Sequence, residues 1–201
     1  MKKLHQLVIG LWMLGIGTVG SGLHWTMLES KMYGETETVI IQGWLKMNAV
    51  QFKIAEILLE RPIPKGNSSI NSEKGTMKLI RAEKSLQIQI ITHDRSEGYY
   101  WYHFWQKFAN WYGQGEKIGI TFVSQAYKDI TPVAMWEIIK QIQPSNVITE
   151  EENNKYYMAA GYDSFLGEGL TVAGEKLNWN VVYNKDRKRI YFGSPIIYQT
   201  Y

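Results

Sequence analysis

Apolar and polar residues alternate with a period of two in several short stretches of the chain, a pattern typical of β-strands with one buried and one open face. In the stretch that begins near residue 36, the apolar positions are Val39, Ile41 and Leu45. The positions that alternate with them are Gln42, Trp44 and Lys46. Similar patterns predict strands over residues 77–82, 86–93, 118–122, 155–162, 177–184 and 189–198. The short polar links 83–84 and 185–188 predict two hairpins.

Two further stretches of the first half predict a helix and a loop. The helix begins at Asn48, a preferred N-cap residue, and ends at Pro62 and Pro64. Its apolar stripe, which we expect to be buried, is Val50, Ile54, Ile57 and Leu58. Residues 65–75, rich in Ser, Asn and Gly, predict the loop.

A second helix is predicted after residues 94–98, where aromatic residues recur at spacings of three and four. They are Trp101, Phe104, Trp105, Phe108, Trp111 and Tyr112. Such a stripe can bind lipid or sugar, but it more often forms part of the core, and we expect it to be buried.

A third helix is predicted after Thr131, which is expected to cap it, with Pro132 at its first position. The positions expected to be buried in this helix are Met135, Ile138, Ile139 and Ile142. Pro144 is expected to stop it.

The order of these elements predicts an α+β fold built by imperfect duplication. The first half, about 36–113, reads β-α-β-β-α, and the second, about 114–201, reads β-α-β-β-β. The helices are frequent enough to cover one face of an antiparallel sheet, so the other face is expected to be open.

The start of the chain has the layout of a secretory signal. Lys2 and Lys3 precede an uncharged, mostly apolar run over residues 7–28, with Gly20, Ser21 and Gly22 inside it. The sequence therefore predicts a signal peptide or an N-terminal membrane anchor over residues 1–28, and an extracytoplasmic domain over 29–201. The alternative is a helix buried in the domain, because the most apolar part, 7–19, is shorter than the ~20 residues that usually span a bilayer.

Composition narrows the class of protein. Cysteine is absent, which excludes disulfides, thiolate catalysis and thiolate metal sites. The 22 Lys and Arg residues include Lys2 and Lys3, so the remaining chain has 20 basic against 19 acidic residues. This balance argues against nucleic-acid binding. An exported domain without disulfides is typical of a bacterial envelope protein.

Three segments near the C-terminus carry a family resemblance. They are Tyr156-Tyr157-Met158-Ala159-Ala160-Gly161-Tyr162, Leu177-Asn178-Trp179-Asn180-Val181-Val182-Tyr183-Asn184 and Phe192-Gly193-Ser194-Pro195-Ile196-Ile197. The chain resembles the YwmB-like family, exported proteins of spore-forming Firmicutes of uncharacterised function. The resemblance implies a TATA-box-binding-protein-like fold and an extracytoplasmic location, and it supplies no catalytic or binding residue. Ser194 stands where that family usually has Thr, and Gln199-Thr200-Tyr201 replaces its usual Glu-Tyr close.

Strand alternation gives the most specific hypothesis for a site. On the open face we expect Gln42, Trp44, Lys46, Gln87, Gln89, Thr121, Asn178, Asn180 and Tyr191. Aromatic faces stack on the apolar patches of sugars, and amides pair with hydroxyl or backbone groups. The face therefore suits a cell-wall polymer, a peptide or an envelope-protein partner. A plain solvated face, or one covered by another strand or by the leader, is the alternative.

Other candidate sites are weaker. Asp163 and Glu168 flank a glycine turn and would be the carboxylates of an enzyme acting on cell-wall material. The basic cluster Lys185, Arg187, Lys188 and Arg189 suits an anionic polymer or lipid headgroups.

No chemistry is expected from the remaining polar residues. His5, His24, His93 and His103 lack metal-ligand spacing, the Glu150-Glu151-Glu152 run is expected in a solvated loop, and Ser124, Ser164 and Ser194 lack a nucleophile motif. The sequence therefore predicts a noncatalytic binding module without metal or cofactor. An accessory domain of a membrane-bound complex is a further alternative.

Overall fold

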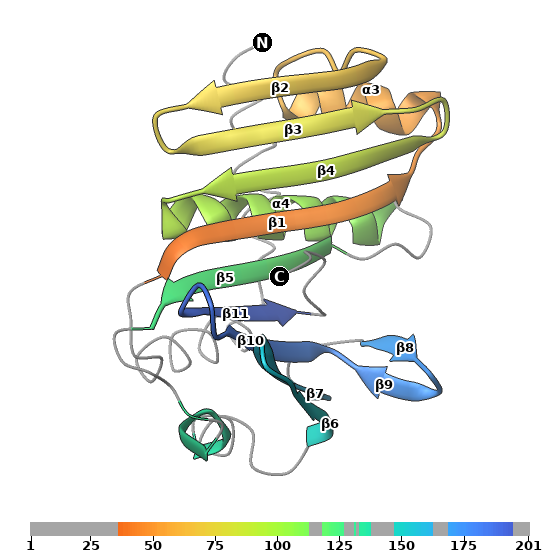
Figure 1. Ribbon diagram of the computed structural model, residues 1–201. Coiled ribbons are helices and arrows are strands. Elements are labelled where there is room, and N and C mark those ends of the chain that lie inside the picture. The colour runs from red at the N-terminus through yellow and green to blue at the C-terminus, as the bar shows by residue number, and fades with distance from the viewer. Residues whose placement is uncertain are drawn as a thin grey trace.

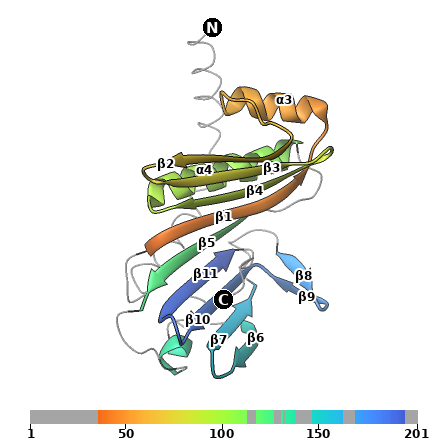
Figure 2. The same cartoon turned by 45° about the horizontal axis from the view of Figure 1, so that its top comes forward.

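The computed structural model describes residues 36–112, 118–126, 131, 133–137, 147–162 and 169–194 (Figure 1). In these ranges, nine strands form one antiparallel sheet in the order β2-β3-β4-β1-β5-β11-β10-β7-β6 (Figure 2). The strands are β1 (Thr36–Lys46), β2 (Gly66–Ser72), β3 (Gly75–Arg81), β4 (Ser85–Thr92), β5 (Ile118–Gln125), β6 (Val147–Glu152), β7 (Tyr156–Gly161), β10 (Trp179–Asn184) and β11 (Arg189–Ser194). A separate hairpin consists of β8 (Leu170–Val172) and β9 (Glu175–Leu177). The predicted α+β class and antiparallel sheet are confirmed.

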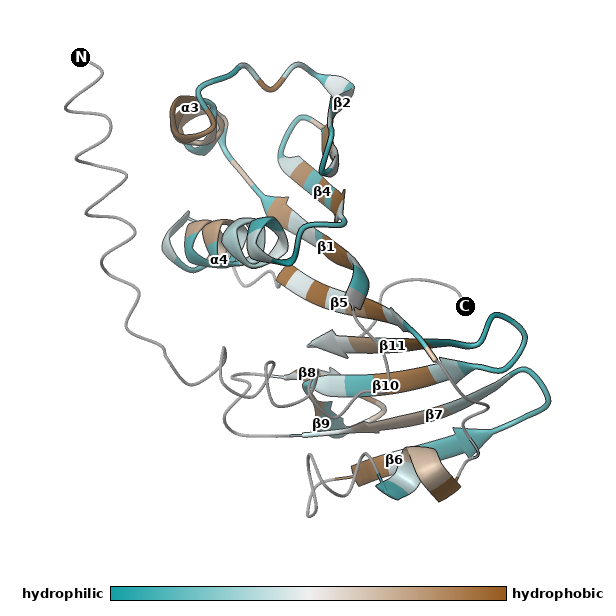
Figure 3. Ribbon diagram, turned by 90° about the vertical axis from the view of Figure 1, so that its left-hand side faces the viewer, coloured by the Kyte–Doolittle hydropathy of each residue, from teal (hydrophilic) through white to brown (hydrophobic). Residues whose placement is uncertain are grey.

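Two helices, α3 (Ala49–Leu58) and α4 (Arg95–Tyr112), lie on the same side of the sheet (Figure 3). The α4 helix approaches β1 closely at Gly98, where an added Cβ would lie 2.7 Å from Cγ1 of Val39. The Val39 side of β1 is therefore the helix side of the sheet. We call this the inner face and the opposite one the outer face.

The aromatic stripe of α4 supplies the centre of the core on the inner face. Trp105 and Phe108 are fully buried and Phe104 nearly so, as predicted, while Trp101 and Tyr112 are half-buried against the core. The prediction is wrong for Trp111, whose side chain is 57% exposed. Trp111 lies in the last turn of α4, at the rim of the aromatic stripe, while the next residue, Tyr112, still packs against the core.

The α3 helix begins as predicted but turns a different side to the core. Asn48 and Gln51 form a reciprocal capping box, with Gln51 N–H donating to Asn48 Oδ1 at 3.0 Å. The predicted buried stripe is correct in part: Ile54 and Leu58 are half-buried against the core, whereas Val50 and Ile57 are 67% and 49% exposed. The buried residues of α3 are Phe52 and Ala55.

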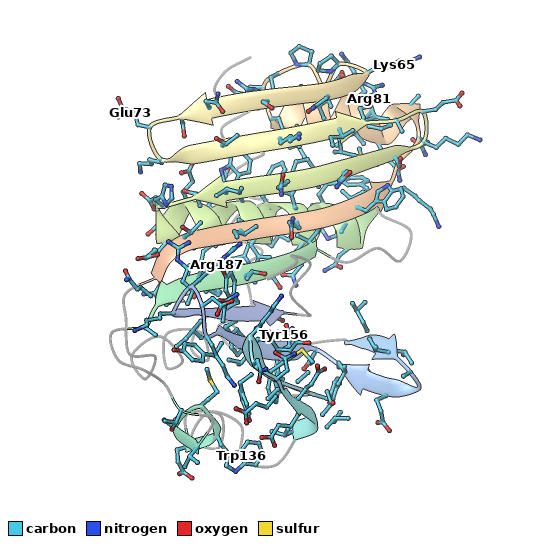
Figure 4. All side chains as sticks on the ribbon, in the orientation of Figure 1. Lys65, Glu73, Arg81, Trp136, Tyr156 and Arg187 are labelled. Carbon is cyan, nitrogen blue, oxygen red and sulfur yellow. The ribbon has the colours of Figure 1, made fainter. Side chains whose placement is uncertain are left out.

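Arg81 explains this rotation of α3. Its guanidinium, at the end of β3 beside α3 (Figure 4), lies 4.0 Å from the centroid of the Phe52 ring. Its Nη1 donates to Glu56 Oε1 at 3.1 Å and to the Ile63 carbonyl at 2.6 Å. The cation–π contact and the ion pair hold the Phe52 side of the helix against the sheet, so Val50 and Ile57 face solvent.

The predicted loop 65–75 is instead mostly strand β2. It pairs with β3 over its whole length, from Gly66 opposite Arg81 to Ser72 opposite Gly75. The Glu150-Glu151-Glu152 run, also predicted as loop, belongs to β6 at the opposite edge of the sheet. Edge strands have one neighbour and largely solvated side chains, so neither segment shows apolar alternation.

Apart from β6, most of the elements predicted for the second half are confirmed where they are described. β5 and the 185–188 hairpin are confirmed. Thr131 Oγ1 accepts from the Ala134 N–H at 3.2 Å, residues 133–137 are helical and Met135 is fully buried. The predicted strand 177–184 is divided, because β9 ends at Leu177 and β10 starts at Trp179. Pro132, Ile138, Ile139, Ile142 and Pro144, and residues 195–198 of the last predicted strand, lie outside the described residues.

An exposed ion pair fastens the start of α4 to the β2–β3 turn. Asp94 Oδ1 accepts from the Glu97 N–H at 3.0 Å, and Asp94 Oδ2 accepts from Lys74 Nζ at 2.7 Å. The Lys74 ammonium holds the pKa of Asp94 below its ordinary value of 3.8. A carboxyl with a depressed folded-state pKa stabilises the fold above its unfolded pKa and loses this contribution as the pH falls through the folded pKa.

We therefore expect Asp94→Asn to be less stable than the wild type at pH 7, with the difference shrinking as the pH drops below about 4. Asparagine still caps the helix, so the variant removes mainly the charge. Urea unfolding at pH 7 and pH 3 measures the difference. A difference that is unchanged between the two pH values would contradict the role given to the ion pair.

Candidate functional site

The outer face of the first four strands presents an ordered array of polar side chains. The register places Trp44 opposite Gln87, Gln87 opposite Ile80 and Ile80 opposite Asn67. The neighbouring row runs Gln42, Gln89, Lys78 and Ser69. We call these eight residues the outer platform. No register shift interrupts the pairs among β1, β4, β3 and β2, so the rows lie about 7 Å apart and the strands about 4.8 Å apart.

Trp44 is the aromatic residue of the outer platform, and 59% of its surface is accessible. Its position between the buried Leu45 and the half-buried Gly43 follows from alternation along β1. An indole held at this exposure on a regular strand offers a rigid flat face for stacking. Gln87, opposite it, is also exposed and supplies an amide next to the ring.

The second row brings two amides and an ammonium group together. Gln42 and Gln89 are half-buried neighbours across β1 and β4, and Lys78 follows on β3. The Oε1 atom of Gln42 is buried and finds no hydrogen-bond partner among the described residues. Leaving such an acceptor unpaired costs about 1–3 kcal/mol.

Beyond β1, several side chains expected on the outer face are buried. Thr121, Asn178, Asn180 and Tyr191, all expected to be exposed, are at most 5% exposed. The prediction of exposure is therefore wrong for these four residues. It is correct for Trp44, Lys46 and Gln87, while Gln42 and Gln89 are half-buried.

An apolar cluster on the outer face explains part of this difference. Ile40, Val123, Val182 and Tyr191 pack together there, with Ile91, Tyr156 and Met158 against them. β10 is buried at every position and β11 at every position after Arg189. Strands buried on both faces lose the simple apolar and polar alternation, so period-two reasoning assigns half of their residues to solvent wrongly.

Four platform residues were not found from the sequence: Asn67, Ser69, Lys78 and Ile80. Asn67 and Ser69 belong to the segment predicted as a loop. The signal that was available for β2 is the tight turn Glu73-Lys74 next to a predicted strand, which is typical of a hairpin with a polar partner strand.

The basic hairpin between β10 and β11 is largely engaged within the domain. Lys185 Nζ pairs with Glu152 Oε1 at 2.7 Å, and Arg189 Nη2 lies 3.3 Å from Glu37 Oε2. Arg187 remains exposed at the hairpin tip (Figure 4). These contacts leave fewer basic side chains for an anionic ligand than the sequence suggested.

The glutamates of β6 are held in the same way. Tyr157 Oη donates to Glu150 Oε1 at 2.8 Å, and Tyr156 Oη donates to Glu151 Oε1 at 2.7 Å. Burial is the main cause that raises the pKa of Tyr157 far above its ordinary value, and the hydrogen bond to Glu150 raises it further. The phenols therefore remain protonated donors to the carboxylates at neutral pH.

The residues that the sequence analysis considered for catalysis or metal binding are either separated from one another in the fold or lie outside the described residues. His93 Nδ1 lies 2.9 Å from the Glu37 carbonyl, and burial on α4 lowers the pKa of His103. Ser124 and Ser194 are buried on separate strands. Asp163, Ser164, Glu168, His5 and His24 lie outside the described residues. Within the described ranges, no three His, Asp or Glu side chains gather into a possible metal site.

A pocket of about 440 Å³ lies where the end of β1 meets the start of α3 and the β3–β4 turn. Its lining residues are Lys46, Met47, Asn48, Ala49, Gln51, Glu83 and Lys84. They come from the end of β1, the start of α3 and the turn between β3 and β4. The Met47 N–H donates to the Lys84 carbonyl at 2.9 Å, which fixes the turn against β1.

In the part of the chain that the structure describes, no helix is both long and apolar enough to cross a membrane. Comparison of the sequence with protein-family models and with curated proteins finds no match in either set.

Proposed function

We propose that the protein is a noncatalytic, extracytoplasmic binding module that holds a bacterial cell-wall polysaccharide on its outer platform. The observation that carries this proposal is the exposed Trp44 indole set in a regular array of amide side chains. Sugar rings present an apolar face that stacks on indole and hydroxyl groups that pair with amides.

The size and regularity of the outer platform favour a polymer over a small molecule. An open sheet face buries only one side of a ligand, whereas sites for small ligands usually enclose most of the ligand surface. A single sugar is therefore expected to bind weakly. A polymer with repeated units gains from the high local concentration of further copies of the same unit.

The side chains of the outer platform supply four amides, one hydroxyl, one indole and one ammonium group. General acid–base hydrolysis of a glycosidic bond uses a pair of carboxyl groups, which this set does not provide. Binding is therefore the function that the arrangement favours. Asp163 and Glu168, the carboxylates of the alternative enzyme, lie outside the described residues.

We also propose that the two halves derive from one duplicated unit, as the YwmB-like resemblance implies. β1 and β5, the first described strands of the halves, are adjacent and antiparallel at the middle of the sheet. From β1 outward the order is β4, β3, β2, and from β5 outward it is β11, β10, β7, β6. Each half thus adds its strands from last to first.

The basic and apolar start of the chain supports an extracytoplasmic location.

A retention experiment tests the proposed function. The full chain, kept in mild detergent, is mixed with purified Gram-positive cell walls and sedimented. We expect retention that soluble wall fragments compete away, and at least about tenfold weaker retention of a Gln87→Ala, Gln89→Ala variant, because each amide hydrogen bond contributes about 1 kcal/mol. Equal retention of the variant and the wild type would contradict the proposal. A Gln106→Ala, Asn110→Ala variant, which removes two amides from α4 on the inner side of the sheet, is the matched control.

A further inference from the structure

The two edges of the large sheet differ in how they are protected from other strands. β6, at one edge, carries three glutamates, residues 150–152, and its pairing with β7 has a register shift between Val147 and Thr149. β2, at the other edge, contains no charged residue and no proline, and it pairs with β3 without a shift. Charges, prolines and bulges keep edge strands from pairing with further chains, and β2 lacks all three.

Alternate residues of β2 direct their backbone N–H and C=O groups away from β3. The Ala82 N–H donates to the Ser85 carbonyl at 2.9 Å, so the even-numbered residues of β3 bond to β4 and the odd-numbered residues bond to β2. The partners of these odd-numbered residues are the even-numbered residues of β2. The backbone groups of Asn67, Ser69 and Asn71 therefore point outward, and they form no hydrogen bond within the described part of the chain.

We propose that β2 pairs with β2 of a second copy of this chain, antiparallel and centred on Ser69. In this register the whole strand is paired, and Lys65, four residues before Ser69, lies opposite Glu73, four residues after it. The two-fold symmetry of such a dimer forms this pair twice, once at each end of the interface. Lys65 and Glu73 are exposed at opposite ends of β2 (Figure 4), and neither forms an ion pair with another described residue.

The remaining positions of β2 are also compatible with its own copy. Asn67 would face Asn71, Ser69 would face itself, and no two like charges would meet. The outward N–H and C=O groups would gain partners in a new ladder. Two edge strands bury less surface than a standard interface of about 1,200–2,000 Å², so we expect a dissociation constant of about 1–100 µM.

This pairing would join the outer platforms of two copies on one face. Facing residues of antiparallel strands project from the same side of a sheet, so the two-fold axis would be perpendicular to the sheet. The row of Gln42, Gln89, Lys78 and Ser69 would then continue into the same row of the second copy. The pairing itself does not depend on what the outer platform binds.

Sedimentation of the full chain in mild detergent, at about 1–200 µM, tests the pairing, and we expect monomers at the low and dimers at the high concentration. Lys65→Glu sets like charges opposite each other at both ends of the interface and is expected to dimerise about tenfold more weakly. Lys65→Glu, Glu73→Lys exchanges the two charges and is expected to restore the wild-type dimer. Lys155→Glu makes the same charge change at an exposed position next to the β6 edge and is the matched control.

The register can be tested by cross-linking, because the chain has no cysteine of its own. Facing Cα atoms of a hydrogen-bonded antiparallel pair lie about 5.5 Å apart, within reach of a disulfide. Ser69→Cys is therefore expected to form a disulfide-linked dimer under mild oxidation. In Asn71→Cys the two thiols would be four residues out of register, about 13 Å apart, so cross-linking should be at least about tenfold slower.

A wild type that stays monomeric at about 200 µM would overturn the inference and leave the β2 edge to a strand of another protein. Equal cross-linking of the two cysteine variants, or a dimer that Lys65→Glu does not weaken, would also overturn it. Thermal unfolding confirms that each variant is folded. Because no cell-wall material is present, these results do not depend on the proposed function.

Discussion

Truncation of Trp105 to alanine is expected to lower the free energy of unfolding by about 3–5 kcal/mol, the usual cost of removing a fully buried large aromatic side chain. Trp105 is 0% exposed in the middle of α4, with its ring 5.1 Å from that of Phe104 and 5.7 Å from that of Phe108. Its loss leaves a cavity between α4 and the sheet. Since domains of this size are usually stable by only 5–15 kcal/mol, the variant is expected to unfold at much lower urea concentration.

The indole nitrogen of Trp105 provides a control for this prediction. It finds no hydrogen-bond partner among the described residues, so Trp105→Phe removes volume without breaking a hydrogen bond. We expect Trp105→Phe to cost clearly less than Trp105→Ala. Urea unfolding followed by circular dichroism measures both variants, and a loss below about 1 kcal/mol for Trp105→Ala would show that α4 does not form the core described here.

The Trp44→Ala variant is expected to show the opposite behaviour. Its side chain is 59% exposed on the outer platform, so truncation should change the free energy of unfolding by no more than about 0.5 kcal/mol. Binding to cell walls should weaken about thirtyfold, which corresponds to about 2 kcal/mol for an aromatic residue at the centre of a binding site. A thermal melt and a binding isotherm on the same preparation measure the two effects.

A second exposed tryptophan, Trp111, provides the control for the binding prediction. Trp111 has nearly the same exposure, 57%, but sits at the end of α4 on the inner side of the sheet. Trp111→Ala is therefore expected to bind walls like the wild type. A large loss of stability in Trp44→Ala would instead mean that Trp44 packs against part of the chain.

Alternation predicted the strands that have one solvated face and one buried face. β1 and the β3–β4 hairpin follow because Val39, Ile41 and Leu45, and their counterparts in the other strands, meet one core. β5 was also found, although it is buried on both faces. The Asn48 cap and the buried Trp105 and Phe108 of α4 were also predictable, because caps and aromatic stripes depend on local sequence. Gly98 was not singled out, since its role depends on the distance between α4 and Val39.

The errors arise where tertiary contacts determine which side chains are buried and which segments form strands. The side of α3 that is buried is set by Arg81, which is distant in sequence and binds Glu56 and the Phe52 ring. β2 and β6 are polar edge strands without a periodic signal. Tyr191 was assigned to solvent although Ile190, Tyr191 and Phe192 are consecutive apolar residues, a pattern that indicates burial on both faces.

Part of the candidate site was also predictable from the sequence. Gln42, Trp44, Gln87 and Gln89 were found because β1 and β4 alternate cleanly and pair in register. Asn67 and Ser69 join the array only once β2 is known to be a strand. Lys78 lies on the predicted β3 and joins the array through its pairing with Gln89. The pocket at Lys46 and Lys84 depends on how a turn meets the start of a helix, which spacing along the chain does not show.

The measurement that decides most directly whether the outer platform is the binding surface is a side-by-side titration of wild type, Trp44→Ala and Trp111→Ala with muramidase-digested cell-wall fragments. We predict dissociation constants that agree for the wild type and Trp111→Ala and that are about thirtyfold weaker for Trp44→Ala, with superimposable thermal melts for Trp44→Ala and the wild type. Equal affinities for all three proteins, or no binding by the wild type, would contradict the assignment of the outer platform as a polysaccharide-binding site.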